Sequence, residues 1–251
     1  MVFREINKMQ RWKLTLEYDG TGFNGWQGEN GIFIFDTLKT AIYQLTQENT
    51  TPVCAGRTDA GVHALNQVVH FDLKKPFTSR TIIFGLNYHL NNKFLSVLDA
   101  ETVPLEFSAR FSVKYREYKY LLSESEIFLP LLEKKIHCLK KININRIEAA
   151  LEFLSGYFPM YGFCAAKSYR DNMYRSLKCF LTIEYFLHRR IYILNFRAKS
   201  FVHHQIRFMV GAILEYNRGI DKLELYKNNL GQGPKPPLAP AHALYLSAVI
   251  Y

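Results

Sequence analysis

Several features that would place this chain in a membrane, around a metal ion or in an oxidising compartment are missing from its sequence. The four cysteines show no CxxC spacing, so neither a zinc ribbon nor a redox pair is indicated. No apolar run approaches the roughly 20 residues that cross a bilayer. The first thirteen residues contain no continuous apolar segment of the kind found in signal peptides. We therefore expect a reduced, cytoplasmic protein that is not attached to a membrane.

Acidic residues are also scarce, because 22 Asp and Glu stand against 32 Lys and Arg, which gives a net charge of +10. Such an excess favours a polyanionic partner such as nucleic acid and says nothing about the fold. Aromatic residues are abundant, with 16 Tyr and 19 Phe, and some alternate with cations, as in ARFSVKYREYKY (109–120). RNA-binding proteins stack unpaired bases on such rings, although most large rings belong to cores. Composition therefore indicates an RNA partner without proving it.

The predicted secondary structure follows the same order in both halves of the chain. In the first half, the alternation in WKLTLEY (12–18) is typical of a half-buried strand. It is followed by a helix at 34–47, strands at 51–54 and 67–73, a helix at 79–90 and a strand at 94–103. The second half has a strand at 115–124, a helix at 144–154, paired strands at 175–186 and 191–198, a helix at 202–216 and a strand at 243–251.

Each half matches the ferredoxin-like pattern βαββαβ. We predict an α+β fold in which two such halves form a pseudo-symmetric, mainly antiparallel sheet, with the active-site cleft between them. The predicted domains are 1–109, which carries the turn described next, and 110–251. Tandem RNA-recognition modules would have the same order of elements, but no strand matches their K/R-G-F/Y-G/A-F-V-x-F/Y motif, which disfavours that alternative.

The segment CAGRTDAGVH (54–63) places an arginine and a carboxylate two residues apart between glycines. Gly56 and Gly61 permit unusual dihedral angles and the close approach of another backbone. If the turn is extended, Arg57 and Asp59 project to the same side. A solvated ion pair on the surface would use the same residues. An aspartyl phosphatase would need a second carboxylate nearby for Mg²⁺, and the segment GRTDAG has none.

Five segments, in this order, resemble the signature segments of the TruA family of tRNA pseudouridine synthases: YDGTGFNGWQ (18–27), AGRTDAGVHALNQVVHFD (55–72), REYKY (116–120), FVHHQIRFMVGAILEYNRG (201–219) and APAHALYL (239–246). The resemblance extends from Arg11 to Tyr251. It implies an isomerase that converts uridine to pseudouridine in the anticodon stem-loop of tRNA, at nucleotides 38–40. It also implies a homodimer that needs neither a metal nor a cofactor.

The resemblance assigns roles to particular residues. Asp59 would be the catalytic aspartate, Tyr118 the tyrosine that stacks on the target base, and Arg207 the basic partner of the aspartate. The residues expected to bind or shape the RNA are Arg57, Gly56, Gly61, His63 and Arg116. Of these, Arg57 would also help to place the flipped nucleotide, and His63 is expected to orient the turn.

The chemistry of the reaction agrees with these roles. Isomerisation breaks a C–N glycosidic bond and rejoins the base through carbon, so nothing is oxidised and no group is gained. The protein must supply a carboxylate, a platform for the detached base and a group that removes the C5 proton. Either C6 of the base or C1′ of the sugar is open to attack by Asp59. Because His203 and His204 are adjacent on a predicted helix, we expect them to face different ways and not to bind a metal.

Three places depart from the family pattern. Phe35 stands where a glutamine is expected, the segment GYFPMYGF (156–163) lacks the usual His and Asp, and Ala243 replaces a glycine. None of them belongs to the proposed catalytic set, so they bear on how RNA is held. The alternative function is a non-catalytic tRNA-binding protein or chaperone on the same scaffold. The intact catalytic set favours the enzyme.

Overall fold

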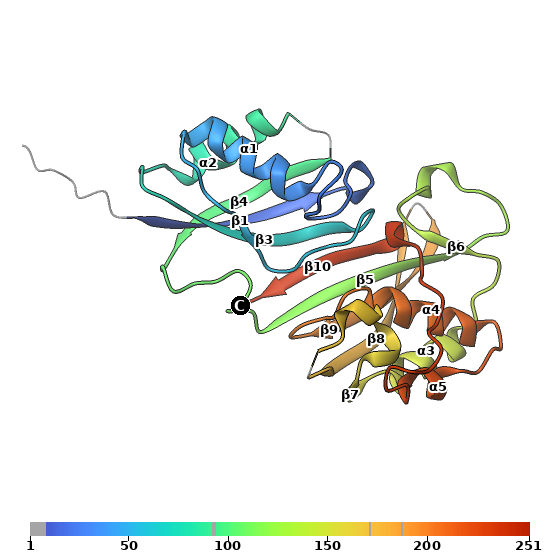
Figure 1. Cartoon of the computed structure of the whole chain (residues 1–251). Coiled ribbons are helices and arrows are strands. Elements are labelled where there is room, and N and C mark those ends of the chain that lie inside the picture. The colour runs from blue at the N-terminus through green and yellow to red at the C-terminus, as the bar shows by residue number, and fades with distance from the viewer. Residues whose placement is uncertain (1–8, 92–93, 171, 187) are drawn as a thin grey trace, which may run out of the picture. The chain divides into compact units, whose positions relative to one another are not determined.

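The computed structural model describes residues 9–91, 94–170, 172–186 and 188–251 (Figure 1). Two compact units account for the chain. Unit 1 is Met1–Lys114 together with Leu246–Tyr251, and unit 2 is Tyr115–Tyr245. The division follows Lys114, whereas the predicted boundary follows residue 109, and the last six residues are part of unit 1.

Unit 1 is built on antiparallel strands covered by two helices. Its elements are β1 (Gln10–Tyr18), α1 (Ile34–Thr46), β2 (Val53–Cys54), β3 (His63–Leu73), α2 (Ser79–Leu90) and β4 (Leu95–Val103), joined by most of β10 (Leu244–Ile250). The strand order is β4-β1-β3-β10, and β2 pairs with β3. Figure 1 shows α1 and α2 on the same side of β4, β1 and β3.

The core of unit 1 follows from the periodicity of the sequence. Every second residue of β1 from Trp12 to Tyr18 is buried, as the alternation predicted. Helix α2 occupies the predicted range: Thr78 caps its start by accepting a hydrogen bond from the Thr81 backbone N–H, and Asn91 ends it in the left-handed conformation. Helix α1 likewise ends at Thr46, and the next residue, Gln47, is left-handed with φ of +58°.

Unit 2 has more strands than the sequence predicted. Its elements are β5 (Tyr115–Glu124), β6 (His137–Leu139), α3 (Ile144–Phe153), β7 (Gly156–Pro159), β8 (Tyr174–Phe186), β9 (Arg189–Ala198), α4 (Gln205–Asn217) and α5 (Leu223–Lys227). The strand order is β5-β9-β8-β7, and β6 runs parallel to β5. The strands β6 and β7 were not predicted, since three or four residues are too few to show a period.

Both faces of β9 are covered within unit 2. Leu194 and Phe196 are fully buried on one face, which also carries Tyr120 of β5. Ile191 and Ile193 alternate with them and pack against Leu129, Leu132 and Ile136, which precede β6. The chain between β5 and β6 therefore forms a small second core together with β9.

The remaining regular structure consists of single 3₁₀ turns at Gly20–Gly22, Pro130–Leu132, Tyr161–Phe163, Ala166–Ser168 and Ala241–Ala243. Within each unit the described strands pair mainly antiparallel, and helices supply the rest, so the predicted α+β class is confirmed. Among the described residues, no helix has both the length and the apolar composition needed to cross a bilayer.

Candidate functional site

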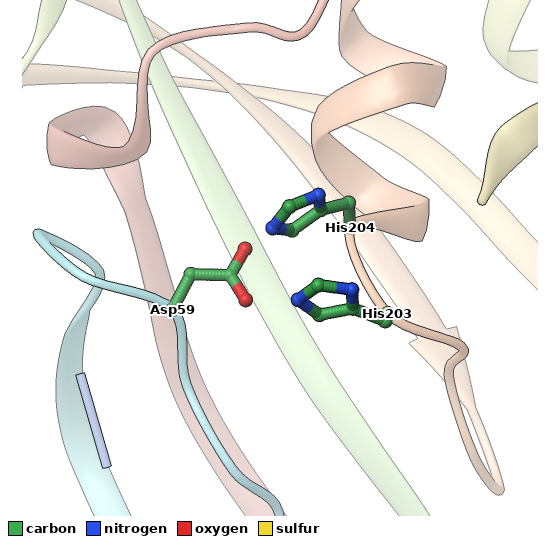
Figure 2. A group of neighbouring side chains, drawn as sticks. All are labelled: Asp59, His203 and His204. Atoms are coloured by element: carbon green, nitrogen blue, oxygen red, sulfur yellow. The ribbon is translucent and has the colours of Figure 1, made fainter. Parts of the chain in front are cut away.

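The predicted site residues lie in two places, the turn before β3 in unit 1 and the elements β5 and α4 in unit 2. The turn, residues 55–62, joins β2 to β3 and carries Arg57, which is exposed, and Asp59, which is half-buried. The Asp59 side chain is drawn in Figure 2. It is closed by a hydrogen bond of 3.2 Å from the Val62 N–H to the Asp59 carbonyl. Gly61 has φ of +78°, which favours glycine, whereas Gly56 does not have positive φ.

Three buried side chains hold the inner side of this turn. The amide nitrogen Nε2 of Gln67 donates to the Gly56 carbonyl at 2.7 Å and to the Tyr18 hydroxyl at 3.3 Å. The Tyr18 hydroxyl lies 2.8 Å from Oγ1 of Thr58. Gly56 and Thr58 stand on either side of Arg57, so both neighbours of that arginine are fixed. Neither Gln67 nor Tyr18 was predicted as a site residue, although both belong to the signature segments.

The loop between β1 and α1 packs against the same turn by its backbone. The Trp26 N–H donates to the Thr58 carbonyl at 3.0 Å. His63 is only 2% exposed, and its Nδ1 accepts a hydrogen bond of 3.1 Å from the Gly20 N–H. The Asp19 carboxylate, 3.1 Å from the same nitrogen, accepts from the N–H and the hydroxyl of Thr21. His63 therefore connects the turn to this loop.

In unit 2, Arg116 and Tyr118 share the buried face of β5. The Tyr118 ring is 7% exposed and meets the Phe201 ring edge to face, with centroids 5.1 Å apart. Arg116 is 8% exposed and donates from Nη1 to the Lys199 carbonyl. The orientation of the Tyr118 ring is thus supported by the segment between β9 and α4.

Arg207 lies in the first turn of α4, where the proline-rich segment 233–240 crosses the helix. Its Nε donates to the Ala239 carbonyl at 2.8 Å, and the Ala239 N–H donates back to the Arg207 carbonyl at 3.1 Å. A Cβ on Gly211, one turn later, would lie 1.7 Å from the Pro237 carbonyl oxygen. The segment therefore sits directly on the helix backbone and fixes the plane of the guanidinium.

The predicted start of this helix at Val202 is wrong, because α4 begins at Gln205. His204 has φ of +63°, which interrupts the helix, and the Gln205 side chain accepts a hydrogen bond of 2.9 Å from the Val202 N–H. His203 and His204 therefore precede the helix. Their rings stack with centroids 3.7 Å apart (Figure 2), so the prediction that they face different ways is also wrong.

Comparison with known proteins identifies the family to which this chain belongs. Residues 157–251 match the family model for tRNA pseudouridine synthase. The chain is 35% identical to tRNA pseudouridine synthase A of Anaplasma phagocytophilum, and the alignment covers 96% of this chain and 100% of that protein. The corresponding figures for the Rhodospirillum centenum protein of the same name are 36%, 97% and 100%, and for that of Wolbachia pipientis wMel they are 33%, 96% and 100%.

The chain belongs to the TruA family of tRNA pseudouridine synthases. It is accordingly a pseudouridine synthase, an isomerase. Among solved structures, a protein of unknown function from Galdieria sulphuraria aligns over 87% of this chain and 93% of its own length at 11% identity. The TM-score of that alignment is 0.23, which is too low to support a common fold.

Unit 2 of this TruA-family chain also contains a buried polar cluster next to Arg207, which no sequence motif indicated. The Tyr120 hydroxyl, on β5, lies 3.0 Å from Nδ1 of His137, and the His137 and His242 rings meet edge to face at 6.5 Å. Burial raises the pKa of Tyr120, and the Arg207 guanidinium acts in the opposite direction. Burial lowers the pKa of His137 to about 4, and the charges of His242 and Arg218 act in the same direction.

We predict that His137 lowers the stability of the folded protein in acid. The unfolded chain binds a proton at His137 below its ordinary pKa of 6.5, whereas the folded chain resists protonation until about pH 4. Stability from this group is therefore complete above pH 6.5 and is lost as the pH falls through that interval. The side chain of His137→Gln cannot be protonated. Between pH 6.5 and pH 4, urea unfolding should therefore show that this variant loses roughly 1–2 kcal/mol less free energy of unfolding than the wild type, after allowance for solvent screening.

His89→Gln, the same change on α2 of unit 1, controls for the loss of a histidine in general. Equal losses of stability in the wild type and His137→Gln between pH 7 and pH 4 would contradict this account of the Tyr120 cluster.

Proposed function

We propose that this chain forms pseudouridine from uridine in the anticodon stem-loop of tRNA, at nucleotides 38–40, with Asp59 as the nucleophile. We also propose that it acts in the cytoplasm as a homodimer, and that no metal or cofactor takes part. The observation that carries the proposal is the alignment with proteins named tRNA pseudouridine synthase A along 96% of the chain. The contacts around the turn of residues 55–62 support the choice of nucleophile.

The scaffold that we propose for this reaction consists of two ferredoxin-like halves, with domains at 1–109 and 110–251. In unit 1 the strand order β4-β1-β3, with β2 beside β3, supports the proposal because it is the order of an antiparallel βαββαβ sheet. In unit 2 the order β5-β9-β8, with α3 and α4 packed on each other, is compatible with the same plan.

In the proposed reaction, the carboxylate of Asp59 attacks the flipped nucleotide and the bond between C1′ and N1 breaks. The base then turns over and is joined to C1′ through C5, and the bond to the Asp59 carboxylate breaks, which frees the enzyme. Loss of the C5 proton and gain of a proton at N1 restore the uracil ring, so the product is an isomer of uridine. Because a base in a stem-loop is stacked, flipping costs a few kcal/mol, which contacts to the RNA must offset. Arg57 is exposed beside Asp59 and is the residue that we assign to those contacts, together with the shape of the turn at Gly56 and Gly61.

Tyr118 is assigned to the base itself. A detached uracil has to be kept near the sugar, and an aromatic ring holds any base by stacking, which contributes about 1–3 kcal/mol. The edge-to-face contact with Phe201 supports this role because it gives the tyrosine ring one orientation before a base arrives. Arg116 hydrogen-bonds the Lys199 carbonyl, so we assign it to the support of β5 near Tyr118.

Arg207 is assigned to keeping the nucleophile charged. Covering a carboxylate with a nucleotide removes water and raises its pKa, which disfavours the ionised form. A guanidinium about 4 Å away contributes roughly 4 kcal/mol at an effective dielectric near 20, equivalent to about three pKa units. The hydrogen bond from Arg207 Nε to Ala239 supports the assignment because it holds the guanidinium in one plane.

Asp59→Asn should reduce the rate of pseudouridine formation by on the order of a thousandfold or more and leave tRNA binding intact. Binding depends on many cationic contacts and counterion release, and loss of one negative charge does not weaken these. Chemical mapping of pseudouridine on an unmodified tRNA transcript measures the first quantity, and filter binding measures the second. Asp99→Asn, the same change at an exposed position of β4, should behave as wild type. Turnover by Asp59→Asn would show that Asp59 is not the nucleophile. Lost tRNA binding would show that the turn serves to bind RNA.

Tyr118→Phe should reduce turnover because the hydroxyl is lost, and Tyr118→Leu should reduce it further because the ring is lost as well. The extra loss should correspond to about 1–3 kcal/mol of stacking. Single-turnover rates at saturating tRNA give both values. Tyr192→Leu removes a ring of β9 that is 5% exposed and measures the cost of losing a buried tyrosine. If Tyr118→Leu turns over like Tyr192→Leu, then Tyr118 is a core residue.

The homodimer follows from the reach of a single subunit. A stem-loop bound at one site leaves the rest of the tRNA beyond a chain of 29.3 kDa, so a second subunit extends the surface that holds it. Sedimentation velocity at micromolar concentration should show a particle of twice the chain mass. A fully active monomer would refute this part of the proposal.

A further inference from the structure

The hydrogen bonds beneath the turn of residues 55–62 form one connected chain. Gln67 of β3 is completely buried, and its Nε2 reaches both the Gly56 carbonyl and the Tyr18 hydroxyl. The Tyr18 hydroxyl, on a side chain that is 3% exposed, continues the chain to Oγ1 of Thr58. Three side chains from β1, the turn and β3 are thus linked through neutral groups alone.

The direction of these hydrogen bonds follows from the chemistry of the groups. A backbone carbonyl only accepts, so Gln67 must turn its NH₂ group, and not its oxygen, toward Gly56. The same NH₂ group donates to the Tyr18 hydroxyl, which shares a hydrogen bond with Oγ1 of Thr58. The amide oxygen Oε1 of Gln67 is left buried with no hydrogen-bond partner among the described residues.

A buried acceptor without a donor costs free energy in the folded state. An apolar residue at position 67 would avoid this cost but would leave the Gly56 carbonyl and the Tyr18 hydroxyl without Gln67 as their donor. Departures of this kind from good packing concentrate where a structure serves a function. Here the cost falls at the base of the turn that carries Asp59.

We propose that Gln67 and Tyr18 are positioning residues of the pseudouridine synthase, which fix the turn at Gly56 and Thr58 and thereby the direction of the Asp59 carboxylate. This inference rests on the proposed function of Asp59. Gly56 is held through its carbonyl by Gln67, and Thr58 is held twice, through its hydroxyl by Tyr18 and through its carbonyl by Trp26. Thr58 directly precedes Asp59, so a rotation of its backbone would move the carboxylate.

Tyr18→Phe is the test, because it removes one hydroxyl and keeps the buried ring. Single-turnover kinetics on unmodified tRNA should show a rate constant at saturation reduced on the order of 10²-fold, the effect of a displacement of about 1 Å at a reacting group. The half-saturating tRNA concentration should be unchanged, since the cationic contacts are intact. Tyr226→Phe is the matched control: its hydroxyl is also on a side chain that is 3% exposed and donates to Glu215 at 2.6 Å, far along the chain from the turn.

A double-mutant cycle separates positioning from general stability. Thr58→Val removes the hydroxyl at the other end of the same hydrogen bond and keeps the shape of the side chain. If Tyr18 acts through Thr58, the double variant should be no slower than the slower single variant. Thr58→Val alone also tests the proposal if Tyr18→Phe does not fold. Thermal unfolding of all variants shows how much of each effect comes from lost folded protein.

The proposal is overturned if folded Tyr18→Phe turns over at the rate of Tyr226→Phe, or if its only defect is weaker tRNA binding. Multiplicative losses in the double variant would also overturn it, since they would show that the two hydroxyls act independently. These outcomes differ from a failure of the proposed function. That failure would appear as a wild-type protein that forms no pseudouridine, or as an active Asp59→Asn variant.

Discussion

The turn of residues 55–62 depends on a backbone contact that leaves no room for side chains. A Cβ on Gly20 would lie 2.1 Å from the Val62 carbonyl oxygen, and one on Gly25, whose φ is +98°, would lie 2.9 Å from the Thr58 carbonyl oxygen. Glycine is therefore required at two points where the loop after β1 meets the turn. The hydrogen bonds from the Gly20 N–H to His63 and from the Trp26 N–H to Thr58 lie where the two backbones approach this closely.

Regular elements of this fold were predictable where burial follows a simple period. The bounds of α2 and β5 agree with prediction, since apolar residues recur along them at the helical and the strand spacing. The start of α4 was not predictable from that pattern. The left-handed backbone at His204 prevents the helix from beginning at Val202, so α4 begins at Gln205, and a histidine gives no sequence signal of this conformation. The strands β6 and β7 depend on pairing with distant partners, and their own residues are too few to show it.

The candidate site was predictable to a different extent. Asp59, Tyr118 and Arg207 were assigned through resemblance to the TruA family, and the structure supplies the contacts around each of them. Gln67 was not assigned, because a glutamine in a strand ordinarily indicates a solvent-facing position. In β3 the residues from Gln67 to Phe71 are all buried, so alternation fails along this strand and the pattern hides the role of the amide. The Tyr120–His137 contact was hidden similarly, since β6 itself was not predicted.

The pairing of β1 with β3 shows where charges are used and where they are avoided. At one end of the pair, Arg11 and Asp72 are opposite each other and form two hydrogen bonds of 2.7 and 2.8 Å between guanidinium and carboxylate. At the other end, Tyr18 and Gln67 connect the same strands to the turn through neutral groups. An ion pair at this second end would add a fixed field beside Asp59, at a place where a low dielectric makes charges act strongly on each other. The hydrogen bonds of Tyr18 and Gln67 contribute to the geometry of the turn without adding a charge of their own. Under the proposed function, the charge of the Asp59 carboxylate is then governed by the groups that come with the substrate and by Arg207.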